Sequence, residues 1–179
     1  MLGLKQDRAR LPKLLLEERG QAVIEMTLVG IPLIFMLVSI FEIARGMWAY
    51  ETLAHAVREA TRYAIVHGQN CSVAPNSCAI TIGNIASRLN SSGIGLPSDE
   101  LNVRITSLTD DIVCNPVSTC LTSSTVFPSS GANGVGNPIT IAATYNFRSA
   151  LAMFWPGAAT AVSFTAINLP ASSTDYIQF

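Results

Sequence analysis

The sequence predicts an α+β protein in which one long N-terminal helix packs on a small antiparallel sheet. An apolar run of twenty residues, 22–41, continues into an amphipathic helical pattern that ends near Val66. Apolar residues then alternate with polar ones at 101–106 and at 139–147, which is typical of half-buried strands. A shorter alternation at 161–167 predicts a third strand.

The apolar run predicts a single membrane crossing. A bilayer core of about 30 Å requires roughly 20 apolar residues at helical rise, and this run carries one charged residue, Glu25. A cleaved secretory signal is the main alternative, but its apolar region is about 7–15 residues long and ends in small residues at the cut. The run here is longer and continues without such a break, so an anchor is the better interpretation.

Charge is distributed unequally on the two sides of this run. Residues 1–19 hold five basic and three acidic side chains, whereas the chain beyond residue 68 holds three basic and five acidic ones. Basic residues before a membrane segment hold that end in the cytoplasm. We therefore expect residues 1–20 to be a cytoplasmic leader, 21–67 a transmembrane and extended helix, and 68–179 a periplasmic α+β domain.

The outer half of the long helix carries a heptad-like stripe of mostly small residues. The stripe begins at Ile43 and includes Thr61, and it predicts a packing surface. Either a neighbouring subunit's helix or the protein's own sheet can cover it. The residues predicted to pack against another subunit are Glu25, Pro32, Met47, Tyr50, Ala54, Val57 and Ala64.

The remainder of the chain predicts a short amphipathic helix at 79–90, a long loop at 109–137 and a loosely held tail from Ala171. Four cysteines follow the membrane run, as expected of a disulfide framework in an oxidising compartment. Neighbouring pairs favour the bridges Cys71–Cys78 and Cys114–Cys120. A crossed pairing and free thiols are the alternatives.

Composition and motifs give no support to an enzyme or to a nucleic-acid-binding protein. The net charge is −1, and the sequence holds no G-x-S-x-G, H-E-x-x-H or G-x-x-x-x-G-K motif. His55 lies between Glu51 and Glu59, which is better explained by a solvated helix face than by a metal site. We expect no catalytic residue, metal, cofactor or small-molecule substrate.

The chemistry of the chain centres on the start of the apolar run. A carboxylate inside a membrane helix costs roughly 3 kcal/mol on insertion scales, so Glu25 is a functional candidate by default. Gly20, at the cytoplasmic edge, exposes its peptide bond to a membrane protease. A cut there would make Gln21 the new N-terminus, and its ammonium group could neutralise Glu25 of a neighbouring subunit.

Several linked motifs resemble the TadE-like family of the tight-adherence, or Flp, pilus assembly system. They are GQAVIE at 20–25, Pro32 within the apolar run, FEIAR at 41–45 and AVREATRYA at 56–64. The resemblance implies a pilin-like fold and a bacterial inner-membrane pseudopilin. It also implies that a prepilin peptidase cuts after Gly20, leaving Gln21 as the mature N-terminus and Glu25 as the fifth mature residue.

The implied partners are the membrane, the prepilin peptidase, other pilins or pseudopilins and the pilus assembly proteins. The mature chain would remain in the inner membrane or enter the pilus. The alternative from another functional class is an uncleaved, single-pass periplasmic binding or sensing module. Some relatives with the same domain keep their leader, so the resemblance leaves both possibilities open.

Overall fold

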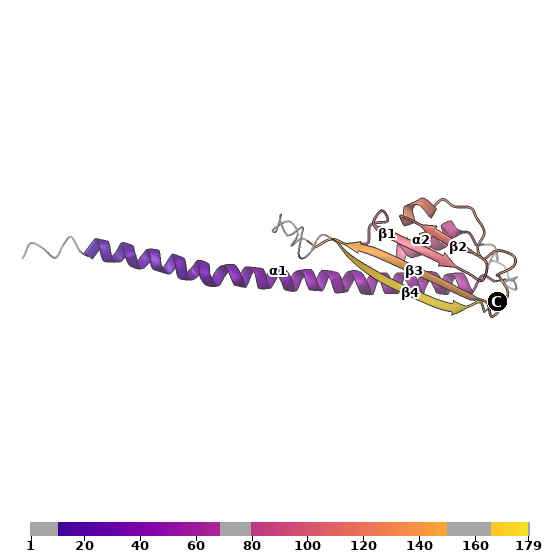
Figure 1. Ribbon diagram of the computed structural model, residues 1–179, viewed down its shortest axis with the longest axis horizontal. Coiled ribbons are helices and arrows are strands. Elements are labelled where there is room, and N and C mark those ends of the chain that lie inside the picture. The colour runs from indigo at the N-terminus through magenta and orange to yellow at the C-terminus, as the bar shows by residue number, and fades with distance from the viewer. Residues whose placement is uncertain (1–10, 69–79, 150–165, 179) are drawn as a thin grey trace, which may run out of the picture. The chain divides into compact units, whose positions relative to one another are not determined.

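The computed structural model describes residues 11–68, 80–149 and 166–178, with side chains described from residue 20 onward. Figure 1 shows the elements, which confirm the predicted α+β class. In chain order they are α1 (Leu11–Ile65), α2 (Ile82–Ser92), β1 (Leu101–Thr106), β2 (Asp111–Cys114), the 3-10 turn η1 (Val117–Cys120), β3 (Pro138–Phe147) and β4 (Ile167–Tyr176).

The chain divides into two compact units, Met1–Ile43 and Ala44–Phe179. The second unit therefore contains the outer half of α1 together with α2 and the sheet. The sequence placed a boundary near residue 68, where the long helix ends. The unit begins earlier because the helical residues from Ala49 onward contribute to its core.

Helix α1 starts ten residues before the predicted start at Gln21. Pro12 lies in its first turn, where a missing N–H leaves no helical hydrogen bond unmade. Residues 13–19 are Lys, Leu, Leu, Leu, Glu, Glu and Arg, all good helix formers. The second half of the predicted leader is thus helical, from Leu11 onward. The same helix continues without a break through Pro32.

The sheet has four antiparallel strands in the order β2-β1-β3-β4. Strands β1 and β3 confirm the two predicted alternations, and Val103 pairs with both Cys114 of β2 and Ala143 of β3. Strand β2 lies where the sequence predicted only loop. It is four residues long and has one buried side chain, so it leaves little periodic signal.

The C-terminal tail is a strand, which corrects the prediction that it is loosely held. Strand β4 pairs with β3 along its whole length, from Phe147↔Ile167 to Pro138↔Tyr176. The predicted third strand at 161–167 lies outside the described residues except for its last two, and the observed strand begins at Ile167. Small polar residues on an edge strand hide β4 from a search for alternating apolar residues.

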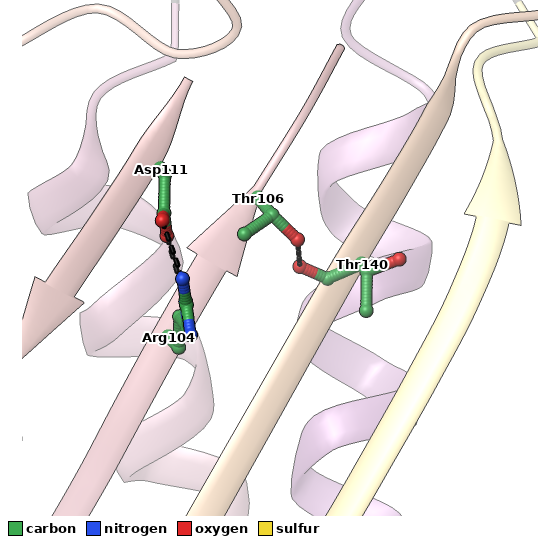
Figure 2. Close-up of polar contacts among 4 residues, drawn as sticks. All are labelled: Arg104, Thr106, Asp111 and Thr140. Atoms are coloured by element: carbon green, nitrogen blue, oxygen red, sulfur yellow. Dashed lines mark hydrogen bonds and ion pairs between the residues drawn. The ribbon is translucent and has the colours of Figure 1, made fainter. Parts of the chain in front are cut away.

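Both helices of the second unit cover one face of the sheet. Figure 2 views the opposite face, and the helices pass behind the strands. Residues of α1 that enter the core recur at three- and four-residue steps: Ala49, Leu53, Ala56, Val57, Ala60 and Ala64. Most are alanine, so the helix backbone can approach the sheet closely. Val57 and Ala64 therefore belong to the protein's own core, so at these two positions the protein itself covers the stripe, which is one of the two predicted alternatives.

Helix α2 confirms the amphipathic segment predicted at 79–90. Thr81 caps its N-terminus in a reciprocal capping box. The backbone N–H of Asn84 donates to Thr81 Oγ1 at 3.2 Å, and the backbone N–H of Thr81 donates to Asn84 Oδ1 at 3.1 Å. The predicted apolar face is buried against the core: Ile82, Ile85, Ala86 and Leu89. The helix ends at Ser92, and the Gly93 N–H donates to the Leu89 carbonyl.

A disulfide joins Cys114, at the end of β2, to Cys120 in η1, with their Cα atoms 5.8 Å apart. It ties η1 to the edge of the sheet, and Cys114 is fully buried. The predicted partner pair, Cys71 and Cys78, lies outside the described residues.

The outer face of the sheet is polar and solvent-exposed. Arg104 forms a bidentate ion pair with Asp111, with Nε to Oδ1 at 2.7 Å, and Thr106 donates from Oγ1 to the Thr140 carbonyl at 3.2 Å (Figure 2). The Arg104 hydrogen bond lowers the pKa of the Asp111 carboxyl, but both side chains are largely exposed. Exposed pairs of this kind contribute little to stability.

Asp110 is the more important carboxylate of this hairpin. It accepts hydrogen bonds from the Ser129 N–H and from Ser107 Oγ, both at 2.8 Å. Partial burial raises its pKa, but the hydrogen bonds from Ser129 and Ser107 outweigh burial and leave the pKa below its usual value. The carboxylate thereby holds the loop at Ser129 against the turn between β1 and β2.

We expect Asp110→Ala to lower the free energy of unfolding by about 1–2 kcal/mol at neutral pH, because two hydrogen bonds to a charged group are lost. Because the pKa of Asp110 is lower in the folded state, its carboxylate stabilises the fold at pH values above the unfolded-state pKa of about 3.9. This stabilisation disappears as the pH falls through the folded-state pKa. Urea titrations at pH 7 and in a series below pH 4 measure this. Asp111→Ala is the control and should change stability less at pH 7.

Candidate functional site

The N-terminal segment of α1 presents apolar side chains on all sides. Exposed fractions include 73% for Leu28, 60% for Ile34 and 71% for Phe41. From Gly20 onward the helix contains a window with mean hydropathy 2.3, and none of that window is buried. By length and composition this helix can cross a membrane. An exposed apolar surface of this extent supports membrane anchoring.

Gly20, Gln21 and Glu25 lie together at the start of this surface. The Gln21 side chain donates from Nε2 to Glu25 Oε1 at 3.3 Å, as the one-turn spacing of the two residues allows. Both side chains are exposed. Toward the C-terminus the next charged residue is Glu42, so the Glu25 carboxylate is followed by sixteen uncharged residues.

The peptide bond between Gly20 and Gln21 is inside the helix, nine residues after its start at Leu11. A Cβ added at Gly20 would have no neighbour within 4 Å, and the same holds for Gly30 ten residues later. Neither glycine is therefore required for packing among the described residues. Glycine lowers helix stability by roughly 1 kcal/mol relative to alanine, so Gly20 makes this turn easier to open.

The residues predicted to contact another subunit fall into two groups. Glu25, Pro32, Met47 and Tyr50 are exposed and Ala54 is half-buried, so they stay available for packing. Val57 and Ala64 are 1% and 0% exposed and are not available. Sequence reasoning missed that Leu53 and Ala60 form the centre of the buried face, although their seven-residue spacing was visible.

Two further kinds of site concern the second unit, a ligand-binding hollow and a metal centre. A shallow polar hollow of about 200 Å³ lies between α1 and α2, lined by Tyr63, Asn84, Ser87, Arg88 and Ser91. The Arg88 guanidinium lies 5.1 Å from the centre of the Tyr63 ring, a cation–π contact that stabilises the helix pair. Within the described ranges no three His, Cys, Asp or Glu residues gather in a way that would hold a metal ion.

These features define an α+β protein with a helix long and apolar enough to cross a membrane, and its distinctive polar residues lie at the start of that helix. Residues 20–62 match the model of the family described as TadE-like protein, which confirms the resemblance over this segment. The match begins at Gly20 and ends within α1, so it covers about a quarter of the chain. No curated protein and no solved structure matches this sequence.

Proposed function

We propose that this chain is a pseudopilin-like structural subunit for assembly of a tight-adherence, Flp-type pilus. A prepilin peptidase removes residues 1–20, and the mature chain begins at Gln21. The chain is inserted in the bacterial inner membrane with its N-terminus in the cytoplasm and the unit that follows in the periplasm. It has no catalytic activity of its own.

One observation carries this proposal: the TadE-like match begins at Gly20, between the charged leader and the apolar surface that starts at Val23. A cut at that position would separate the charged leader from the membrane-spanning helix. The lone carboxylate Glu25 lies one turn beyond the new N-terminus, and Gln21 already contacts it. The start of the family match, the start of the apolar surface and the Glu25 carboxylate thus all lie within one short stretch of α1.

Cleavage requires the helix to open locally, because a protease binds its substrate backbone in an extended form. Gly20 favours that opening, and a Cβ added there would meet no atom within 4 Å outside its own helix turn, so no tertiary contact holds this position. After cleavage, the new α-ammonium of Gln21 would add positive charge at the helix N-terminus. An incoming subunit could then place its own ammonium against the Glu25 carboxylate of its neighbour.

Gly20→Leu should block removal of the leader and leave the precursor in the membrane, because a branched side chain fills the space beside the scissile bond and leucine stabilises the helix. Gly30→Leu is the matched control, since Gly30 also has an open environment but lies away from the proposed cut. The measurement is immunoblotting of membranes from the native host. Normal processing of Gly20→Leu would contradict cleavage at this bond.

A further inference from the structure

Four exposed apolar side chains form an apolar patch on the second unit: Met47, Trp48, Ile94 and Ile167. Their exposed fractions are 65%, 53%, 72% and 50%. They come from α1, from the turn after α2 and from the first residue of β4. Single exposed apolar residues are ordinary on protein surfaces, but a group drawn from three separate segments requires an explanation.

Two sets of contacts bring these segments to the same end of the unit. The Trp48 ring lies against Gly95, whose φ of +81° allows the turn to approach it, and a Cβ at Gly95 would overlap the ring. On the sheet side, the Arg45 guanidinium lies 5.2 Å from the centre of the Phe147 ring. Phe147 is the β-partner of Ile167, so the end of β3 and the start of β4 lie beside this part of α1 (Figure 1).

The second unit begins at Ala44, next to Arg45, and so its first residues lie at this same end. Met47 follows Phe41, the last residue of the apolar run, by six positions, or about 9 Å at helical rise. Side chains on a helix lean toward its N-terminus, so Met47 and Trp48 lean back toward the apolar run. The headgroup layer on each side of a bilayer is roughly 5–8 Å thick, so these two side chains reach it.

The chemistry around the patch matches a membrane surface. Tryptophan is enriched at membrane interfaces. The Arg148 guanidinium forms an ion pair with Glu100 at 3.5 Å, and its side chain remains 74% exposed, so it can also contact lipid phosphate. Strand β3 ends and strand β4 begins at this end. Exposed apolar side chains beside a tryptophan and an arginine are suited to the boundary between headgroups and acyl chains.

We propose that the apolar patch rests on the bilayer surface, so that the second unit contacts lipid directly as well as being tethered by α1. Ile94 and Ile167 enter the headgroup region, and Trp48 and Arg148 lie at its outer boundary. This inference rests on the proposed membrane anchoring. A lipid surface is favoured over a protein partner because Met47 and Trp48 follow the apolar run within two turns of the same helix, α1.

Photo-crosslinking in the native membrane tests the proposal. Benzoylphenylalanine replaces Ile94 in the full chain, and lipid adducts are measured by mass spectrometry after irradiation. Leu108 is the matched control because its side chain is also largely exposed, at 62%. It follows Thr106, the end of β1 that lies away from the patch, about 17 Å along the strand from Leu101. Phe35, in the apolar run, serves as the reference for a side chain in the membrane.

We expect a several-fold excess of lipid adduct at position 94 over position 108, with adduct also at position 35. Adduct at position 35 with none above the control level at position 94 would overturn the inference and leave the membrane anchor in place. Absence of adduct at both positions would contradict the anchor as well. A protein adduct at position 94 in place of lipid, or equal lipid adduct at positions 94 and 108, would also overturn the inference.

Discussion

Replacing Glu25 with alanine is expected to abolish pilus assembly while leaving the chain anchored in the membrane. Removing the carboxylate lowers the cost of placing this helix in lipid, which is roughly 3 kcal/mol for a charged residue, so insertion is not impaired. The loss instead falls on assembly, because the Gln21 ammonium of a neighbouring mature subunit has no carboxylate to approach. Sheared surface fractions and membrane fractions, immunoblotted in parallel, measure the two effects separately.

Thr27→Ala is the matched control for this substitution. Thr27 is two residues from Glu25 and is also exposed, but its hydroxyl donates to the Ile24 carbonyl of its own helix at 2.9 Å. Its removal should leave pilus assembly unchanged. Wild-type numbers of pili on cells that carry Glu25→Ala would contradict the role assigned to the carboxylate and favour an uncleaved, anchored binding or sensing module.

The largest effect on stability is expected for Leu53→Ala, with a loss of about 3 kcal/mol in the free energy of unfolding. Leu53 is fully buried where α1 meets the sheet, and its neighbours on that helix face are mainly alanines. Small neighbours cannot move in to fill the cavity that the substitution leaves. Equilibrium unfolding of the full chain in detergent micelles, followed by tryptophan fluorescence, measures the change.

Met47→Ala removes a side chain of similar size from the same helix and is the control for Leu53→Ala. Met47 is 65% exposed, so its truncation should change the free energy of unfolding by less than about 0.5 kcal/mol. A large loss at Met47 together with a small loss at Leu53 would show that α1 packs on the sheet through a different face.

The sequence predicts α1, α2, β1 and β3 because each of them carries a strong periodic signal. The face of α1 that packs on the sheet was harder to identify. Alanines recur on two adjoining faces of its outer half, so the stripe through Met47 and Tyr50 and the true core face through Ala49 and Leu53 have similar spacing. Only the packed structure separates them, because alanine has little preference for one face.

Strand β4 could not be predicted from its sequence pattern, because this edge strand is held in place mainly by hydrogen bonds to the neighbouring strand β3. Ser172 and Thr174 point to solvent, and the opposite side chains are only half-buried, so apolar and polar residues do not alternate. The proposed processing site, in contrast, could be identified from the sequence. Gly20 and Glu25 stand out in the sequence because a glycine and a lone carboxylate next to an apolar run are chemically conspicuous without any tertiary contact.

The apolar patch, in contrast, could not be predicted from the sequence. Ile94 and Ile167 are more than seventy positions apart, and nothing in the local sequence of either residue relates them. They reach the same end of the unit only because Trp48 packs on Gly95 and Phe147 pairs with Ile167. Sites assembled from distant segments in this way become visible only after folding.

The most direct test of the central claim is the mass of the N-terminal peptide of the protein purified from its native membrane. We expect a mature chain that begins at Gln21, with residues 1–20 removed and Glu25 in the fifth position. A chain that begins at Met1 or Leu2 would contradict prepilin-peptidase processing and would favour a permanently anchored, uncleaved protein.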